Sequence, residues 1–90
     1  MKVITYKNEI LFPVRDGYDE KRLYTEVAEI LRRLNGVDVG ESVTGPWCDY
    51  RICSLNGDAF KLVYDLDDGT YITCDQRDAL MSLHDRLMDA

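Results

Sequence analysis

Apolar and polar residues alternate most clearly from Ala59 to Asp65. The larger apolar side chains stand at every second position there, namely Phe60, Leu62 and Tyr64. A period of two is typical of a β-strand with one buried face. The flanking segments 56–58 and 67–69 are Asn-Gly-Asp and Asp-Asp-Gly, which supply the glycine that tight hairpin turns need. We therefore predict three consecutive antiparallel strands in the segment 47–74.

The two flanking strands of this meander show the same alternation. From Trp47 to Leu55, one face carries Cys48, Tyr50 and Ile52, and the other carries Asp49, Arg51, Cys53 and Leu55. From Thr70 to Cys74, Tyr71 and Thr73 fall opposite Thr70, Ile72 and Cys74. The two faces are unequally apolar, as expected of an antiparallel sheet that helices cover on one side.

Two amphipathic helices are predicted to form that cover. The first begins after Asp19, a good N-cap residue, and ends at Asn35-Gly36, because glycine readily adopts the left-handed conformation of a helix C-terminus. Tyr18 and Leu23 are placed to contact each other across its first turn. The second helix begins after Asp75 as its N-cap. Apolar residues recur at helical spacing in both helices: Leu23, Val27, Ile30, Leu31 and Leu34, then Ala79, Leu80, Leu83, Leu87 and Met88.

The remaining segments give shorter signals. Lys2–Tyr6 and Glu9–Val14 predict either a hairpin or one bent strand, and Arg15–Gly17 predicts a turn. Val37–Val39 or Glu41–Thr44 could add a brief strand before the meander. The whole chain of 90 residues is thus predicted to be one α+β domain. Its expected architecture is an antiparallel sheet of three to five strands with two helices on one face, in the order β(β)αβββα.

The composition is that of an ordinary globular domain, with 46% hydrophobic and 31% charged residues. No apolar run approaches the ~20 residues of a membrane span. Residues 1–6 lack the apolar stretch of a signal peptide. Three cysteines without CxxC spacing favour free thiols in a reducing compartment. We therefore expect a cytoplasmic protein that does not bind membranes.

The net charge of −6 is unevenly distributed. Residues 1–34 contain seven Lys and Arg against six Asp and Glu, whereas residues 35–90 contain four against eleven. The acidic excess therefore lies in the meander and the last helix. Such a surface repels nucleic acid and anionic membranes and attracts basic partners.

Candidate catalytic and metal-binding groups do not form a recognisable set. His84 is the sole histidine, and no third group at a typical spacing would orient a pair formed with Cys74. Cys48 and Cys53 are five positions apart, so in one strand they point to opposite faces and do not share a zinc ion. The segment 65–76 departs from the glycine and glutamate positions of a calcium-binding loop. We expect no enzyme activity, no metal and no cofactor.

Acidic residues near the meander turns are the candidate functional group. They form either a solubility surface or a docking face that steers a cationic protein. The only tryptophan lies beside them, and it suits either the edge of the core or an interface anchor. The predicted partner-binding residues are Trp47, Asp49, Asp58, Asp65, Asp67 and Asp68.

Three segments carry a resemblance to a known class of protein. They are Gly45–Tyr50, Gly57–Leu62 and Asp68–Ile72, followed by the C-terminal amphipathic helix. This layout resembles that of small bacterial immunity proteins, which neutralise toxins. The resemblance implies an acidic, cytoplasmic, non-enzymatic α+β domain that binds and blocks a partner. We expect an immunity protein or antitoxin whose acidic face blocks a basic protein, such as a toxin nuclease, without direct contact to nucleic acid.

Two alternatives remain open at this point. The first is a phage-encoded inhibitor of a bacterial defence complex, an anti-CRISPR-like protein whose carboxylates mimic nucleic-acid phosphates. The second is a structural subunit that self-associates, for example as a homodimer, through an uncovered sheet face around Val63 and Ile72.

Overall fold

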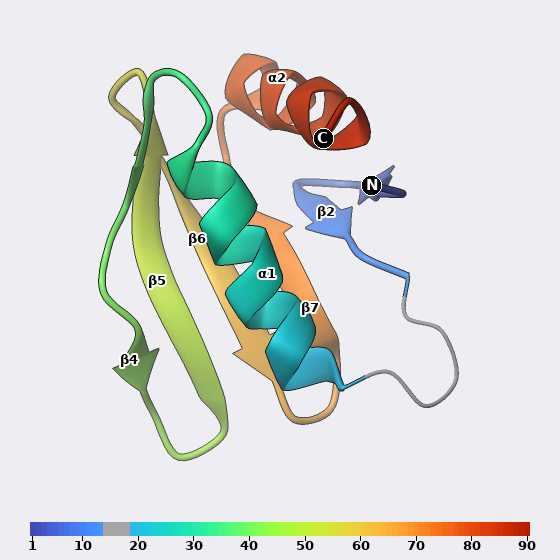
Figure 1. The fold of residues 1–90 in the computed structure, drawn as a ribbon, viewed down its shortest axis with the longest axis vertical. Helices are drawn as coiled ribbons and strands as arrows, with labels where there is room; N and C mark the ends of the chain where they lie inside the picture. Colours follow the sequence, from blue (N-terminus) through green and yellow to red (C-terminus); the bar gives the residue numbers. More distant parts are fainter. Residues whose placement is uncertain (14–18) are drawn as a thin grey trace.

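The computed structural model describes residues 1–13 and 19–90 and arranges them as one antiparallel sheet with two helices (Figure 1). The described residues form seven strands rather than three to five: β1 (Ile4–Tyr6), β2 (Glu9–Leu11), β3 (Val37–Val39), β4 (Val43–Thr44), β5 (Cys48–Leu55), β6 (Asp58–Asp65) and β7 (Gly69–Thr73). Their spatial order is β1-β2-β7-β6-β5-β3, and β4 also pairs with β5. The predicted α+β class and antiparallel meander are therefore confirmed, and the predicted strand count is too low.

The strands outside the predicted meander are short segments, each bonded to a neighbouring strand. β1 and β2 form a hairpin rather than one bent strand, with Lys7 at φ 55° in the turn. Both segments of the connector, β3 and β4, pair with β5. Two or three residues are too few to show alternation, so pairing with a neighbouring strand decides their conformation. The turn predicted at Arg15–Gly17 and the contact predicted for Tyr18 lie outside the described residues.

The first helix, α1 (Glu20–Arg32), begins as predicted after Asp19. The Asp19 carboxylate accepts hydrogen bonds from the backbone N–H groups of Lys21 at 2.9 Å and Arg22 at 3.4 Å. These bonds satisfy donors that the first turn of a helix leaves without a partner. The helix ends before the predicted end at Gly36, because the chain beyond it tightens into hydrogen bonds to the third preceding residue. Gly36 still takes a left-handed φ of 79° in the turn to β3.

The second helix, α2 (Arg77–Met88), has Gln76 as its N-cap, and the cap makes no side-chain hydrogen bond. The predicted N-cap, Asp75, is therefore wrong. Its carboxylate instead accepts a 3.2 Å hydrogen bond from the side-chain amide of Asn8 and so ties the β1–β2 turn to the start of α2. Neither helix described here is long and apolar enough to cross a membrane.

Both helices pack on the same face of the sheet, which we call the helix face, and share one core with it. Figure 1 shows α1 lying along β6 and β7, and α2 beside the N-terminal hairpin. Met88, predicted to be in the buried stripe of α2, is exposed because it lies on the last turn. The largest fully buried side chains come from all of these elements: Ile10, Val27, Leu31, Leu62, Ile72, Leu80, Leu83 and Leu87.

Side chains that point away from the helices form the other face, which we call the open face. It includes Ile4, Tyr6 and Ile52, which are 47, 57 and 50% exposed. The prediction that Val63 and Ile72 share one self-association surface is wrong. Ile72 pairs with Leu62 on the helix face and is fully buried, whereas Val63 pairs with Tyr71 on the open face and is 7% exposed between its neighbours. Because successive positions of a strand alternate between faces, no single surface contains both residues.

Candidate functional site

Two turns meet at one end of the sheet, at the bottom of Figure 1, and we call this the loop end. Gly45–Trp47 joins β4 to β5, and across this turn the backbone N–H of Gly45 donates to the carbonyl of Cys48 at 2.8 Å. The second turn joins β6 to β7. Its Leu66 backbone N–H donates to the carbonyl of Trp47 at 3.3 Å, so the two turns are bonded to each other. The loop end comprises residues 45–49, residues 64–69 and Lys21.

Trp47 and Leu66 are the most exposed large hydrophobic side chains of the described residues, at 74% and 64%. The alternative that Trp47 packs at the edge of the core is therefore wrong. Pro46 has a fixed φ, which restricts the turn that carries the indole. Beside the two side chains lies a hollow of about 150 Å³ that Lys21, Asp49 and Tyr64 also line. Exposed anchors next to a hollow are typical of a surface that binds another protein.

The β6–β7 turn is held by one of its own carboxylates. Asp65 Oδ1 accepts hydrogen bonds from the backbone N–H groups of Asp67 at 2.8 Å and Asp68 at 3.3 Å. Gly69 ends the turn with a left-handed φ of 77°, which a residue with a side chain rarely adopts. Asp65 therefore shapes the turn, while Asp67 and Asp68, which follow the exposed Leu66 in the chain, are exposed as well.

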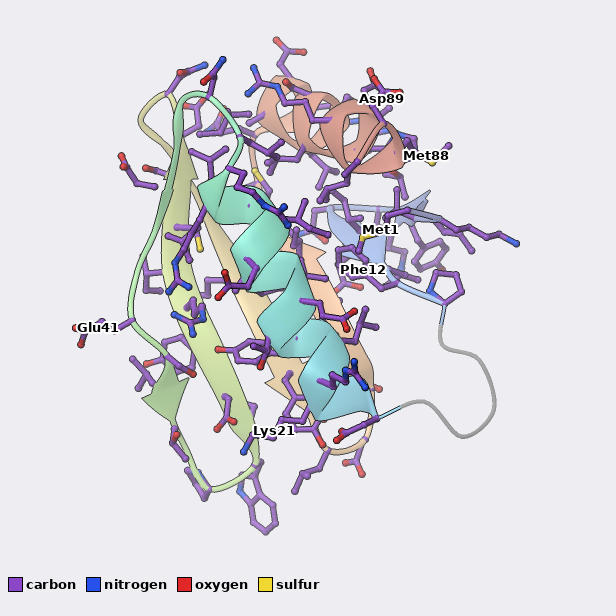
Figure 2. All side chains as sticks on the ribbon, in the orientation of Figure 1. Met1, Phe12, Lys21, Glu41, Met88 and Asp89 are labelled. Atoms are coloured by element: carbon purple, nitrogen blue, oxygen red, sulfur yellow. The ribbon has the colours of Figure 1, made fainter. Side chains whose placement is uncertain are left out.

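Asp49 is placed differently from the turn aspartates. It lies on the helix face, where it pairs in register with Tyr64, and its side chain is 13% exposed. Its Oδ2 is 3.7 Å from Nζ of Lys21, which Figure 2 shows at the N-terminal end of α1. This ion pair joins the helix to the loop end and neutralises part of the acidic charge there.

Asp58 does not belong to the loop end. It is the first residue of β6, whereas Asp65 is the last, and the seven steps of strand between them separate their Cα atoms by about 23 Å. Of the six residues predicted to bind a partner, five therefore come together: Trp47, Asp49, Asp65, Asp67 and Asp68. The single acidic face predicted from the sequence is divided between the two ends of the meander.

A group of polar contacts connects α1 to β5 and to the segment that precedes β4. The hydroxyl groups of Tyr24 and Ser42 are 2.8 Å apart, and the Arg51 guanidinium lies 5.7 Å from the centre of the Tyr24 ring. Arg51 also donates a 2.8 Å hydrogen bond to the carbonyl of Gly40. Burial raises the pKa of Tyr24 above its ordinary 10.0, and the hydrogen bond to Ser42 opposes this rise. Burial likewise raises the pKa of the neighbouring Cys53 thiol above 9.0.

These shifts predict that the domain loses stability in alkaline solution. A group whose pKa is higher in the folded state holds its proton more tightly there, so its stabilisation is complete below the unfolded pKa and is lost as pH rises through the folded pKa. The urea midpoint is expected to fall above about pH 9, first for Cys53 and then for Tyr24. Tyr24→Phe keeps the ring and should make the decline above pH 10 shallower. A midpoint that rises with pH over this range contradicts the burial of these groups.

Cysteine and histidine side chains occupy separate hydrogen-bonded groups. The Cys74 thiol donates to the carbonyls of Ala59 and Gln76, at 3.7 and 3.5 Å. His84 Nδ1 lies 3.1 Å from Oδ1 of Asp85. The three cysteines are free, and the described residues contain no group of three or more His, Cys, Asp or Glu side chains arranged to hold a metal ion. Cys74 and His84, considered above as a possible nucleophile and base, therefore form hydrogen bonds with other groups and not with each other.

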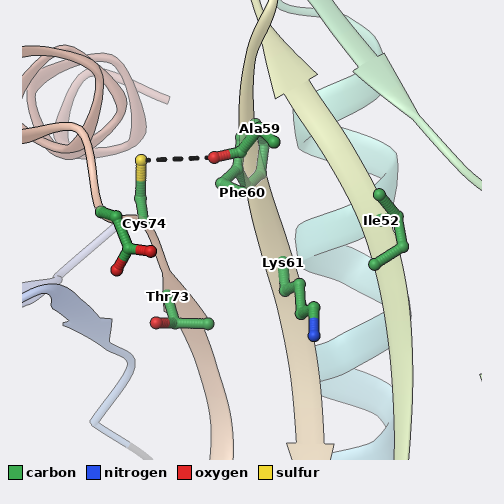
Figure 3. Close-up of a pocket in the computed structure, with 7 residues that line it drawn as sticks. Ile52, Ala59, Phe60, Lys61, Thr73 and Cys74 are labelled. Atoms are coloured by element: carbon green, nitrogen blue, oxygen red, sulfur yellow. Dashed lines mark hydrogen bonds between the residues drawn. The ribbon is translucent and has the colours of Figure 1, made fainter.

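A second hollow, of about 340 Å³, opens on the other end of the molecule. Figure 3 shows Ile52, Lys61 and Thr73 lining it from the neighbouring strands β5, β6 and β7. The Cys74 thiol borders the hollow but is buried and bonded to the Ala59 carbonyl. Lys61 is the one cationic side chain among the lining residues, and its Nζ lies 5.5 Å from the centre of the Tyr50 ring.

Comparisons with known proteins do not identify a family for the chain. No family model matches it, and neither the curated proteins nor the solved structures give a significant match. Its function is therefore inferred from the geometry and charge of the loop end.

Leu66 and Lys21 contribute to the loop end but were not among the binding residues predicted from the sequence. Leu66 stands between two aspartates in a turn, and an apolar residue at that position is itself a signal of exposure. Lys21 lies in the first turn of α1, far from Asp49 in sequence, so only the packing of helix on sheet reveals their ion pair. The place of Lys21 in the loop end therefore depends on tertiary structure, which the sequence pattern does not give.

Proposed function

We propose that this protein is a non-catalytic inhibitor that docks its loop end onto a basic surface of a partner protein. The observation that carries this proposal is the joint exposure of Trp47 and Leu66 on two hydrogen-bonded turns, beside the carboxylates of Asp67 and Asp68. The most specific form of the proposal is an immunity protein or antitoxin whose partner is a toxin nuclease. Such a nuclease is cationic where it binds phosphate, and an acidic domain seated there blocks its substrate.

The two apolar side chains supply most of the binding free energy in this proposal. Interfaces depend on a few aromatic or apolar anchors that become fully desolvated. Burying the exposed part of one tryptophan is worth about 3 kcal/mol at ~25 cal/mol per Å². The bonded turns and Pro46 hold Trp47 in place before binding, so less conformational entropy is lost when the complex forms.

The turn carboxylates act mainly on the rate of association. Because Asp67 and Asp68 are exposed, salt screens their field, and they steer a cationic partner most strongly at low ionic strength. Replacing both with asparagine is expected to slow association about tenfold at low salt and to flatten its dependence on ionic strength. Stopped-flow or surface-based kinetics at several salt concentrations measure this effect.

Asp58→Asn is the matched control, since it removes one carboxylate at the opposite end of β6. It is expected to leave the association rate nearly unchanged. An equal effect of Asp58→Asn would show that net charge, and not the loop end, steers the partner. An association rate that does not change when Asp67 and Asp68 are both replaced contradicts their assignment.

The test of the proposal is capture from cells of the source organism. The immobilised protein and a Trp47→Ala, Leu66→Ala variant are exposed to the same extract, and retained proteins are identified by mass spectrometry. We expect a basic protein that the variant fails to retain. Its nucleic-acid cleavage, or other activity, should stop when one equivalent of the protein is added. A captured protein whose activity continues unchanged at saturation contradicts an inhibitory function.

A further inference from the structure

The open face carries a row of apolar side chains that crosses the sheet. The strand registers place one residue from each strand except β3 beside the next, all on the face away from the helices. The outermost members, Ile4 and Val43, are 47 and 44% exposed. A continuous apolar row on an antiparallel sheet is the kind of surface on which a second sheet packs. From one edge to the other the row is Ile4, Leu11, Tyr71, Val63, Tyr50 and Val43.

The neighbouring row on the same face has its opposite charges placed symmetrically. Thr73 on β7 is its centre, with Glu9 one strand away on one side and Lys61 one strand away on the other. Tyr6 and Ile52 lie two strands from the centre, again on opposite sides. Figure 3 shows Thr73, Lys61 and Ile52 along this row. A rotation of 180° about an axis along β7 therefore exchanges the positions of Glu9 and Lys61. It also exchanges the positions of Tyr6 and Ile52.

We propose that two copies of this chain pack through their open faces around a two-fold axis parallel to β7. The axis brings Glu9 of each copy over Lys61 of the other, so the charges are complementary twice. It also brings the apolar row onto itself, with Leu11 over Val63 of the second copy and Tyr71 over its own equivalent. Every contact then occurs in both directions, as an isologous interface requires.

The shapes of the two faces fit in the same arrangement. The axis places Tyr6 of one copy over Ile52 of the other, at the mouth of the 340 Å³ hollow that Ile52, Lys61 and Thr73 line. Tyr6 is 57% exposed, so its ring is available to enter that hollow. The longer extents of the molecule, 32 and 25 Å, limit the face to about 800 Å², which is near the area that each partner contributes to a standard interface.

A two-fold axis perpendicular to the strands, crossing β6 at Val63, would instead bring Lys61 of one copy over Asp65 of the other. Asp65 Oδ1 already accepts two backbone hydrogen bonds in the β6–β7 turn, whereas the Glu9 carboxylate takes part in no ion pair within residues 1–13 and 19–90. Glu9 is therefore the better acceptor for a second copy. An axis parallel to β7 also keeps both loop ends at the same end of the dimer, where they could engage one partner together.

Sedimentation equilibrium over a concentration series tests the dimer. The natural protein is expected to be dimeric, and Lys61→Glu and Glu9→Lys are each expected to weaken the dimer about tenfold or more, because like charges then face each other twice. The double variant Lys61→Glu, Glu9→Lys should recover most of the lost affinity. Circular dichroism establishes that each variant is folded, and Trp47→Ala, which lies outside the interface, should dimerise normally.

Three results would overturn this inference. The first is a natural protein that stays monomeric up to about 1 mM, because an interface of this size is expected to associate more tightly. The second is a double variant that dimerises as weakly as either single variant. The third is a dimer that is lost in Lys61→Glu and restored by adding Asp65→Lys, since this result, like the second, would exclude the pairing of Lys61 with Glu9.

Discussion

Replacing Leu62 with alanine is expected to lower the free energy of unfolding by about 3 kcal/mol. Leu62 lies in the middle of β6, pairs with Ile72 on the helix face and is fully buried in the core that both helices share. Removing its branched end leaves a cavity that the surrounding side chains fill only partly. A domain of this size is stable by about 5–13 kcal/mol, so the loss is a large share of the total. Urea unfolding followed by circular dichroism measures it.

Leu66→Ala is the matched control, because it is the same substitution four residues further along the chain. Leu66 is 64% exposed, and its truncation is expected to change the stability by less than about 0.5 kcal/mol. Both variants are compared at one protein concentration, since self-association adds to apparent stability. Equal losses in the two variants would contradict the assignment of one leucine to the core and the other to the surface.

Replacing Trp47 with alanine is expected to weaken binding of the captured partner by about 2 kcal/mol, or roughly thirtyfold. The indole is the largest exposed apolar group at the loop end. The hydrogen bond from the Leu66 backbone N–H to the Trp47 backbone carbonyl holds the turn that carries it. The loss should appear mainly as faster dissociation, because an anchor acts on the formed complex more than on the encounter. Calorimetric titration and dissociation kinetics at about 150 mM salt measure the effect.

The fold itself should tolerate this substitution. Trp47 contributes little to the core, so the urea midpoint of Trp47→Ala is expected to match that of the natural protein. Trp47→Phe keeps an aromatic anchor and should retain part of the affinity. A folded Trp47→Ala variant that binds as tightly as the natural protein would remove the indole from the interface.

Patterns that repeat over many residues predicted the fold well. The alternation in β6 and the apolar stripe of α1 each extend over several positions, so one face of each element could be assigned from the sequence. The faces of the two- and three-residue strands could not be assigned in this way, because these strands owe their conformation to hydrogen bonds with β2, β5 or β7. The start of α2 was misjudged for a related reason, since Asp75 bonds to the distant Asn8 instead of capping the helix.

The candidate site was predicted in part. Successive turns of a meander lie at alternate ends of the sheet, which separates Asp58 from the β6–β7 turn. The pairing of β4 with β5 then brings Trp47 to the same end as Asp67 and Asp68. Composition gave the sign of the charge but not its position, and neither the ion pair of Asp49 nor the role of Asp65 in its turn could be read from spacing.

One resonance reports most directly on whether the loop end is the binding surface. Trp47 is the only tryptophan of the chain, so protein labelled with 5-fluorotryptophan gives a single ¹⁹F signal from a side chain that is 74% exposed. The signal is followed while the unlabelled partner is added to saturation. We predict that it moves away from the solvent-exposed position in proportion to the complex formed. A signal that keeps the position of the free protein in a saturated complex would contradict the account.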